Sequence, residues 1–197
     1  AQIERCVRLA LELARSRRGQ LVSVDKSNVL DTSRLWRRTV EELSPGYPDV
    51  VVSHALVDSF AVELALQAES FDVIVTENMF GDILSDLAGG VAGGLGIAAS
   101  ASLGDARPGI FEPVHGSAPD LAGQGTANPA AMLRSVALML EHAFDNDTLG
   151  RFVFDSVEHA MQTRPTRDLG GQATTAEFGD AVLASLEARL AHDEATA

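Results

Sequence analysis

Residues 71–86, FDVIVTENMFGDILSD, contain the pattern on which the fold assignment depends. After Asp72 the first part is apolar and uncharged, which is typical of a strand buried on both faces of a sheet. The second part changes to helical spacing, and we expect a helix to begin near Asp82. A strand that leads directly into a helix is the repeating unit of α/β proteins.

The flanking sequence continues this alternation of short apolar runs with amphipathic stretches. Upstream, we expect strands at 21–25 and 50–56 and helices at 2–18, 32–43 and 59–70. Downstream, we expect loop and short strand at 88–109, a strand at 109–113, a loop at 114–129 and then three helices. The last helix is expected to start at Thr174, whose spacing to Glu177 matches a capping box. The sequence therefore predicts an α/β fold in one compact unit.

Composition narrows the class of protein. The chain has 197 residues, 46% of them hydrophobic and 22% charged, which is typical of a globular protein. A formal net charge of −13 argues against nucleic acid and against membrane surfaces as partners. Cys6 is the only cysteine, which excludes an intrachain disulfide and fits a reducing, cytoplasmic environment. Helical spacing begins at the second residue without an initiator methionine, so we expect the sequence to start inside a domain.

Two aspartates in the opening stretch form the first candidate site. In a helix, Asp82 and Asp86 would stand at i and i+4 on one face, where like charges repel by about 0.2–0.5 kcal/mol. A hard divalent cation such as Mg²⁺ would offset this repulsion. Alternatively, Asp82 interacts with the helix dipole and Asp86 is simply solvated. The spacing by itself leaves both interpretations open.

Lys26 and Asp58 each follow an expected strand. Lys26 is the only lysine among 15 basic residues, and it stands where ligand crevices form in α/β proteins. Asp58 opens the segment that leads into the next expected helix. The alternatives are a solvated surface ammonium for Lys26 and a helix cap for Asp58.

The loop EPVHGSAPD, residues 112–120, offers a second kind of site. Gly116 and Ser117 would let backbone amides approach a nucleotide closely, and His115 could stack on a base. An ordinary loop histidine is the simpler interpretation. No G-x-G-x-x-G motif follows an expected strand, so the sequence does not support the ordinary dinucleotide fold, and G-x-S-x-G is also missing.

Seven motifs in order resemble the β-decarboxylating dehydrogenases, the family of isocitrate and isopropylmalate dehydrogenases. They are SVDKSNVL, YPDV, LVDSFA, FDVIVTENMFGDILSD, ASASLG, FEPVHGSAPDLAGQGTANP and ALMLEHAF. The resemblance implies the α/β fold of that family, with a non-classical nucleotide site. It also implies that residues 1–197 are the C-terminal portion of such a domain and that an upstream half is absent.

The resemblance assigns roles to the candidate residues. Asp82 and Asp86 match metal ligands for Mg²⁺ or Mn²⁺, and Asp58 matches a third ligand supplied by the neighbouring subunit. Lys26 matches the catalytic lysine, which is also donated across a homodimer. Each active site would thus be shared between two subunits.

The resemblance further implies that NAD is the cofactor. Asp120 matches the acid that accepts hydrogen bonds from the ribose hydroxyls, and its charge would repel the 2′-phosphate of NADP. His115 would lie beside the adenine. The adenosine loop would comprise residues 116–128, including Gly116, Ser117, Ala118, Pro119, Asp120 and Asn128.

For the substrate, the resemblance implies a 2-hydroxy acid bound near Lys26, Asn28, Val29 and Asp58. Val29 matches a small apolar residue facing an isopropyl group, which favours conversion of 3-isopropylmalate to 2-oxoisocaproate in leucine biosynthesis. The tartrate, D-malate and homoisocitrate branches are alternatives, as is a non-catalytic dimerising fragment. The only tyrosine, Tyr47, lies in a turn that does not match the family's catalytic tyrosine. We therefore expect the 197 residues alone to be inactive.

Overall fold

The computed structural model describes residues 1–196 and divides the chain into two compact units, Ala1–Val91 and Ala92–Ala197. The expectation of one compact unit was therefore wrong. The division falls where the fourth helix ends. Gly93 and Gly94 follow with φ angles of 114° and 113°, a backbone conformation that no helix can continue through.

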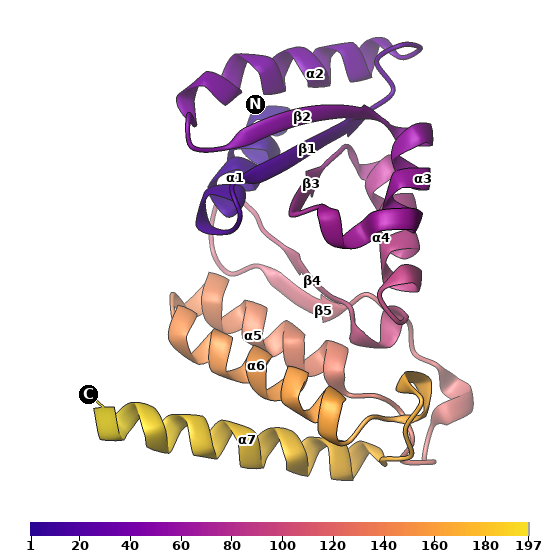
Figure 1. Cartoon of the computed structure of the whole chain (residues 1–197), viewed down its shortest axis with the longest axis vertical. Helices are drawn as coiled ribbons and strands as arrows, with labels where there is room; N and C mark the ends of the chain where they lie inside the picture. The colour runs from indigo at the N-terminus through magenta and orange to yellow at the C-terminus, as the bar shows by residue number, and fades with distance from the viewer. Residues whose placement is uncertain (197) are drawn as a thin grey trace. The chain divides into compact units, whose positions relative to one another are not determined.

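The first unit is built on a three-stranded parallel sheet in the order β2-β1-β3 (Figure 1). The strands are β1 (Gln20–Asp25), β2 (Val51–Leu56) and β3 (Val73–Val75). Leu21 of β1 pairs with Val52 on one side and with Val73 on the other. All three expected strands of this unit are confirmed.

Four helices cover the two faces of this sheet. They are α1 (Gln2–Ser16), α2 (Asp31–Leu43), α3 (Val57–Gln67) and α4 (Asn78–Val91). Leu21 packs in one core with residues of α1 and α2, whereas Val22 and Val24 pack in another with residues of α3 and α4. The side chains of β1 thus alternate between the two helix pairs, as the period of two in a strand requires.

The second unit places a hairpin against helices. Strands β4 (Ala99–Ser102) and β5 (Ile110–Pro113) pair in antiparallel fashion, and α5 (Ala130–Phe144) contacts both. Helix α6 (Asp147–Thr163) packs between α5 and α7 (Thr175–Thr196). Short 3₁₀ turns occur at Ser44–Gly46, Ala68–Ser70, Leu95–Ile97, Pro119–Leu121 and Arg167–Leu169.

The start of α7 was predicted correctly and that of α4 was not. The capping box before α7 is confirmed, since Thr174 N donates to Glu177 Oε2 at 2.8 Å and Glu177 N donates to Thr174 Oγ1 at 3.2 Å. The expected start of α4 near Asp82 was wrong, because the helix begins at Asn78. There Glu77 accepts hydrogen bonds from the amides of Met79 and Phe80, at 3.1 and 3.2 Å.

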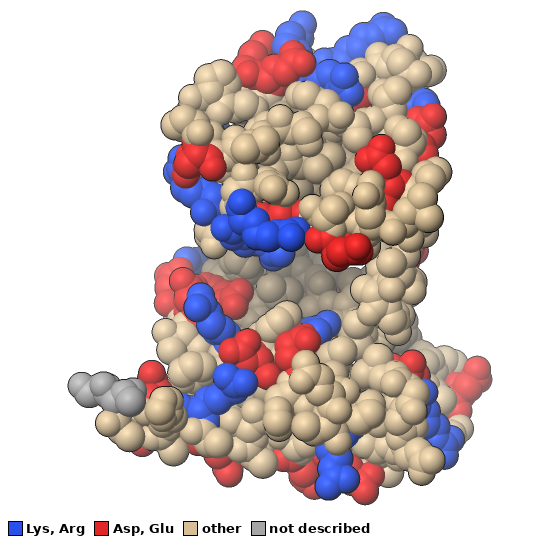
Figure 2. Space-filling model, in the orientation of Figure 1, with Lys and Arg blue, Asp and Glu red and all other residues tan. Residues whose placement is uncertain are grey.

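The surface carries charges of both signs. On the face shown in Figure 2, basic side chains lie in small groups beside acidic ones. Of the helices in residues 1–196, none is both long enough and apolar enough to cross a bilayer.

Candidate functional site

Lys26 and Asp58, 32 positions apart in the chain, meet at the carboxyl end of the sheet. The distance from Lys26 Nζ to Asp58 Oδ1 is 2.5 Å. Lys26 continues the alternation of β1 one residue beyond the strand, so its side chain leaves toward α3 while that of Asp25 leaves toward α2. Asp58 lies in the first turn of α3 and reaches back to the lysine. Asp58 is not the N-cap residue of α3, which is Leu56, so the alternative of a helix cap is not what the structure shows.

The contact has a direct electrostatic consequence. The hydrogen bond from Lys26 holds the pKa of Asp58 below its ordinary value. The side chain of Asp58 is 66% exposed and that of Lys26 is 24% exposed, so the carboxylate remains open to a second ligand. The contact therefore joins a partly buried amine to an exposed carboxylate.

The residues after Lys26 form a tight turn. The Lys26 carbonyl accepts hydrogen bonds from the amides of Val29 and Leu30, at 3.0 and 2.9 Å. Asn28 and Val29 are both exposed, and Val29 is 63% exposed. This turn presents an amide and a small apolar side chain beside the lysine.

Asp82 and Asp86 lie one turn apart on α4, and both are exposed. Asn78 Nδ2 donates to Asp82 Oδ2 at 3.3 Å. Because α4 begins four residues before Asp82, the aspartate lies past the first turn, where the helix dipole has little effect. The helix dipole therefore does not offset the repulsion between the carboxylates of Asp82 and Asp86.

The structure does not bring Asp58 together with these two aspartates in one chain. Within the part of the chain that the structure describes, no three His, Cys, Asp or Glu side chains form a group that could hold a metal ion. Asp82 and Asp86 supply carboxylate oxygens of the type that Mg²⁺ and Mn²⁺ prefer, so the donors fit such a cation.

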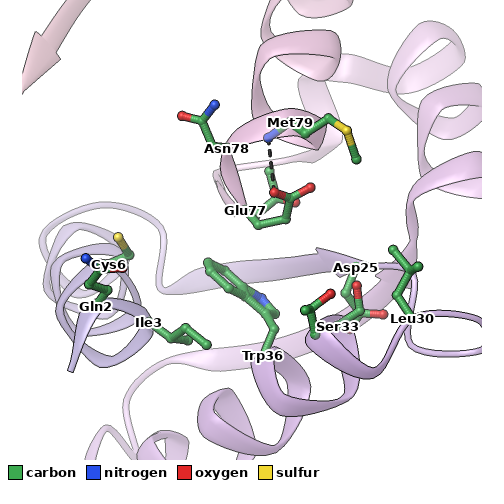
Figure 3. A pocket seen from close by; sticks show the side chains of 12 residues that line it. Gln2, Ile3, Cys6, Asp25, Leu30, Ser33, Trp36, Glu77, Asn78 and Met79 are labelled. Carbon is green, nitrogen blue, oxygen red and sulfur yellow. Dashed lines mark hydrogen bonds between the residues drawn. The ribbon is translucent and has the colours of Figure 1, made fainter.

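A cavity of about 530 Å³ opens beside the end of β1, between α1, α2 and the start of α4 (Figure 3). The Trp36 ring forms part of its wall, and its Nε1 donates to Ser23 Oγ at 3.1 Å. Asp25 and Ser33 lie on one side of the ring and Ile3 on the other. The sequence analysis missed this cavity, because its lining comes from four separate segments.

The second unit has its own cavity, of about 550 Å³. Of the residues expected to bind the nucleotide, His115, Gly116, Ala118 and Asn128 line it. Ser117, Pro119 and Asp120 lie on the adjoining exposed segment. His115 Nδ1 lies 2.8 Å from the Gly116 carbonyl oxygen, and Ala118 adopts a left-handed φ of 40°.

Asp168 is a polar residue of this cavity that the sequence analysis missed. It accepts hydrogen bonds from Asn128 Nδ2 at 2.9 Å and from the buried hydroxyl of Thr166 at 2.6 Å. Asn128 Oδ1 in turn accepts from the Ala130 amide at 2.9 Å, which fixes the orientation of the Asn128 side chain. A Cβ added at Gly96 would lie 3.0 Å from Asp168 Oδ2, so a larger residue there would need the carboxylate to shift by a few tenths of an ångström.

Tyr47 is not a surface side chain, although it lies in the expected turn. It is 8% exposed and packs in the core with α1 and α2 residues, with the Arg15 guanidinium 4.7 Å above the ring. This placement agrees with a structural role.

Comparison with known proteins shows which family the chain matches. Residues 1–182 match the family described as isocitrate/isopropylmalate dehydrogenase. The 3-isopropylmalate dehydrogenase of Zymomonas mobilis is 49% identical over 189 residues, which are 94% of this chain and 53% of that protein. That of Oceanobacillus iheyensis is 50% identical over 197 residues, or 98% of this chain and 54% of the relative. The chain spans about half the length of the curated relatives it matches.

Solved structures agree with this match. Isocitrate dehydrogenase from Methylococcus capsulatus superposes with a TM-score of 0.85 at 38% identity, covering 93% of this chain and 56% of that one. A β-decarboxylating dehydrogenase from Thermococcus kodakarensis, in its apo form, gives 0.83 at 38% identity, with 98% and 57% covered.

Proposed function

We propose, from the premise that this chain belongs to the isocitrate/isopropylmalate dehydrogenase family, that it forms part of an NAD-dependent 3-isopropylmalate dehydrogenase. The reaction would oxidise and decarboxylate 3-isopropylmalate to 2-oxoisocaproate, a step of leucine biosynthesis. The relatives that bear this name support the substrate.

The observation that carries the proposal is the contact between Lys26 and Asp58. It places an amine and a carboxylate together where three parallel strands end, the usual position of a ligand crevice. In its neutral form Lys26 can accept the proton of the substrate hydroxyl. Asp58 holds the amine in place, and Asn28 and Val29 are exposed in the turn that follows Lys26.

Asp82 and Asp86 would hold Mg²⁺ or Mn²⁺ together with Asp58 of a second subunit. When bound, the cation supplies positive charge that stabilises negative charge developing on substrate oxygens. The separation of Asp58 from these aspartates within one chain supports a homodimer whose sites are shared. In such a dimer, Lys26 would serve the same site as the partner's metal ligands.

The cavity of the second unit would hold the adenosine half of NAD. The side chain of Asn128 is held in one orientation by Asp168 and could hydrogen-bond to the nucleotide, and the His115 ring could stack on the adenine. When bound, NAD accepts the hydride that leaves the substrate carbon. Asp120 on the neighbouring segment would accept from the ribose hydroxyls and disfavour a 2′-phosphate.

Partners and location follow as further parts of the proposal. The net charge of −13 disfavours nucleic acid and anionic lipid, and the single cysteine suits the cytoplasm. We infer a small-molecule substrate and a second copy of the chain as the partners.

A chimaera tests the proposed function. It joins the upstream part of the Zymomonas mobilis relative to residue 1 of this chain, so that the length matches the family. We expect NADH formation from 3-isopropylmalate, dependent on Mg²⁺ or Mn²⁺, and slower turnover of D-malate and tartrate. We expect the 197 residues alone to be inactive. Turnover of tartrate or D-malate in preference to isopropylmalate would overturn the substrate assignment.

A further inference from the structure

An ion pair between the buried Asp25 and the partly exposed Arg37 immediately precedes Lys26, and the chemistry proposed above does not use it. Asp25, the last residue of β1, is 1% exposed. Its carboxylate accepts hydrogen bonds from Arg37 Nε at 2.8 Å and from Arg37 Nη2 at 3.2 Å. A third hydrogen bond comes from the backbone amide of Ser27, at 2.8 Å. Asp25 therefore joins helix α2 to the residue that follows Lys26.

The same helix also binds the lysine segment directly. Lys26 N donates to Ser33 Oγ at 3.1 Å, and Ser33 is 3% exposed. Arg34 Nε donates to the Ser27 carbonyl oxygen at 2.9 Å. Ser33, Arg34 and Arg37 lie within the first two turns of α2, so the backbone on each side of Lys26 is tied to the N-terminal half of this helix.

We propose that Arg37, acting through Asp25, is a positioning residue that sets the direction of the Lys26 side chain. Asp25 and Lys26 are consecutive and point to opposite sides of the sheet, so fixing the first carboxylate fixes the side toward which the ammonium leaves. Leaving the buried Asp25 carboxylate without its partner would cost much free energy. The contact with Arg37 therefore fixes the distance between α2 and the end of β1. The inference rests on the proposed role of Lys26 but concerns only its geometry.

The form of the pair fits positioning better than stability. Well-packed apolar side chains of similar volume often stabilise a core as well as a buried ion pair does. A forked guanidinium on a carboxylate fixes angles as well as distance, which an apolar contact does not. The Asp25–Arg37 pair uses both nitrogens of the fork in this way.

The composition supplies a direct probe of this geometry. Lys26 is the only lysine, so a chain labelled with [¹³C]lysine gives NMR signals from this side chain alone. When the ammonium is held against Asp58, the two Hε protons have different surroundings and give separate signals. When the side chain rotates freely, the signals merge. Asp58→Asn provides the reference for a released lysine.

Four variants separate positioning from general loosening of α2. Arg37→Met and Asp25→Asn should merge the Hε signals to the pattern of the released lysine. Arg38→Met is the matched control, because this arginine of the same helix is 67% exposed and lies 3.8 Å from Glu42. Val40→Ala loosens the packing of α2 at a fully buried position away from the lysine segment. Both controls should keep separate signals.

The outcomes are distinct. Separate Hε signals in a folded Arg37→Met variant would overturn the proposal, and so would merged signals in Val40→Ala, because any loosening of α2 would then suffice. If Arg37→Met fails to fold, Asp25→Asn decides by the same measurement, since its amide oxygen can still accept from Ser27. An inactive chimaera with separate lysine signals would count against the proposed function and not against the positioning.

Discussion

At the scale of single residues, the buried carboxylate of Asp25 makes stability depend on pH. Burial alone would raise its pKa, but hydrogen bonds from Arg37 and from Ser27 outweigh burial and hold the pKa below its ordinary value. The unfolded chain therefore binds more protons in this range, and stability falls as the pH drops from about 4 through the lowered pKa of the folded state.

Asp25→Asn should therefore flatten the pH dependence of the free energy of unfolding below about pH 4 and leave it unchanged above about pH 5. Urea unfolding followed by circular dichroism at a series of pH values measures this. Glu42→Gln, at an exposed position of α2, is the control and should keep the wild-type dependence. An unaltered dependence in Asp25→Asn would mean that the pair does not form.

A second residue-scale prediction concerns cofactor choice. In the chimaera, Asp120→Ala should reduce the ratio of kcat/KM for NAD to that for NADP by roughly tenfold, equivalent to about 1.4 kcal/mol. The variant loses an acceptor for the ribose hydroxyls and a charge that repels the 2′-phosphate. Steady-state rates with both cofactors measure the ratio. Asp180→Ala, at an exposed position of α7, is the control and should leave this ratio unchanged. If the ratio were the same in both variants, Asp120 would not be part of the cofactor site.

The position of a site residue could be predicted from the sequence where a single strand or helix determines that position. Lys26 follows β1, and its placement at the carboxyl end of the sheet was predicted directly from the strand pattern. Asp168 and Arg37 were not identified, because their importance depends on contacts with Asn128 and Asp25, 40 and 12 positions away. No local pattern in the sequence carries such a contact.

At the scale of elements, the start of α7 depends on Thr174. Its hydroxyl accepts from the Glu177 amide, and Glu177 accepts from the Thr174 amide. Thr174→Ala should lower the free energy of unfolding of the second unit by about 1 kcal/mol, because one capping bond is lost. Thr163→Ala is the control, since the hydroxyl of Thr163 bonds to a carbonyl of its own helix. Equal losses in both variants, measured by urea unfolding, would argue against the cap.

The loop before α7 depends on Gly171. A Cβ at this position would overlap the carbonyl group of Pro165, which is backbone and cannot turn aside. We expect Gly171→Ala to destabilise the chain by at least about 2 kcal/mol. Gly179→Ala, within α7 and with no atom inside 4 Å of the added Cβ, should stabilise it by about 0.5–1 kcal/mol. Thermal unfolding of both variants checks the contrast; a neutral Gly171→Ala would refute the close approach.

The start of α4 shows why an element boundary was misplaced. The change to helical spacing placed the expected start near Asp82, whereas the helix begins at Asn78, where Glu77 accepts from the amides of Met79 and Phe80. Glutamate is not among the favoured capping residues, so its role was not visible in the sequence. The spacing of the two aspartates on one face was nevertheless unaffected.

At the scale of the whole molecule, the alternation of strands and helices identified the α/β class correctly, and it is consistent with the matched family. The division at Val91 was not foreseen. Glycine-rich sequence predicts loop but does not say whether the elements on either side share a core, because that depends on contacts between distant residues.

The shared active site can be tested by complementation in the chimaera. Lys26→Ala removes the amine, and Asp82→Ala removes a proposed metal ligand, so each variant should be nearly inactive by itself. If the two groups serve different sites of a dimer, a mixed dimer carries both lesions in one site and leaves the other intact. Within the described residues, Asp58 is hydrogen-bonded to Lys26, and Asp58, Asp82 and Asp86 do not form one group that could hold a metal ion.

The decisive measurement is the rate of NADH formation after the two inactive variants are mixed under conditions that exchange subunits. Random exchange makes half of the dimers mixed, each with one intact site, so about a quarter of the wild-type rate should return. Native mass spectrometry verifies the exchange, and each variant mixed with itself is the control. No recovery despite verified exchange would place Lys26 and Asp82 in the same chain's site and contradict the shared architecture.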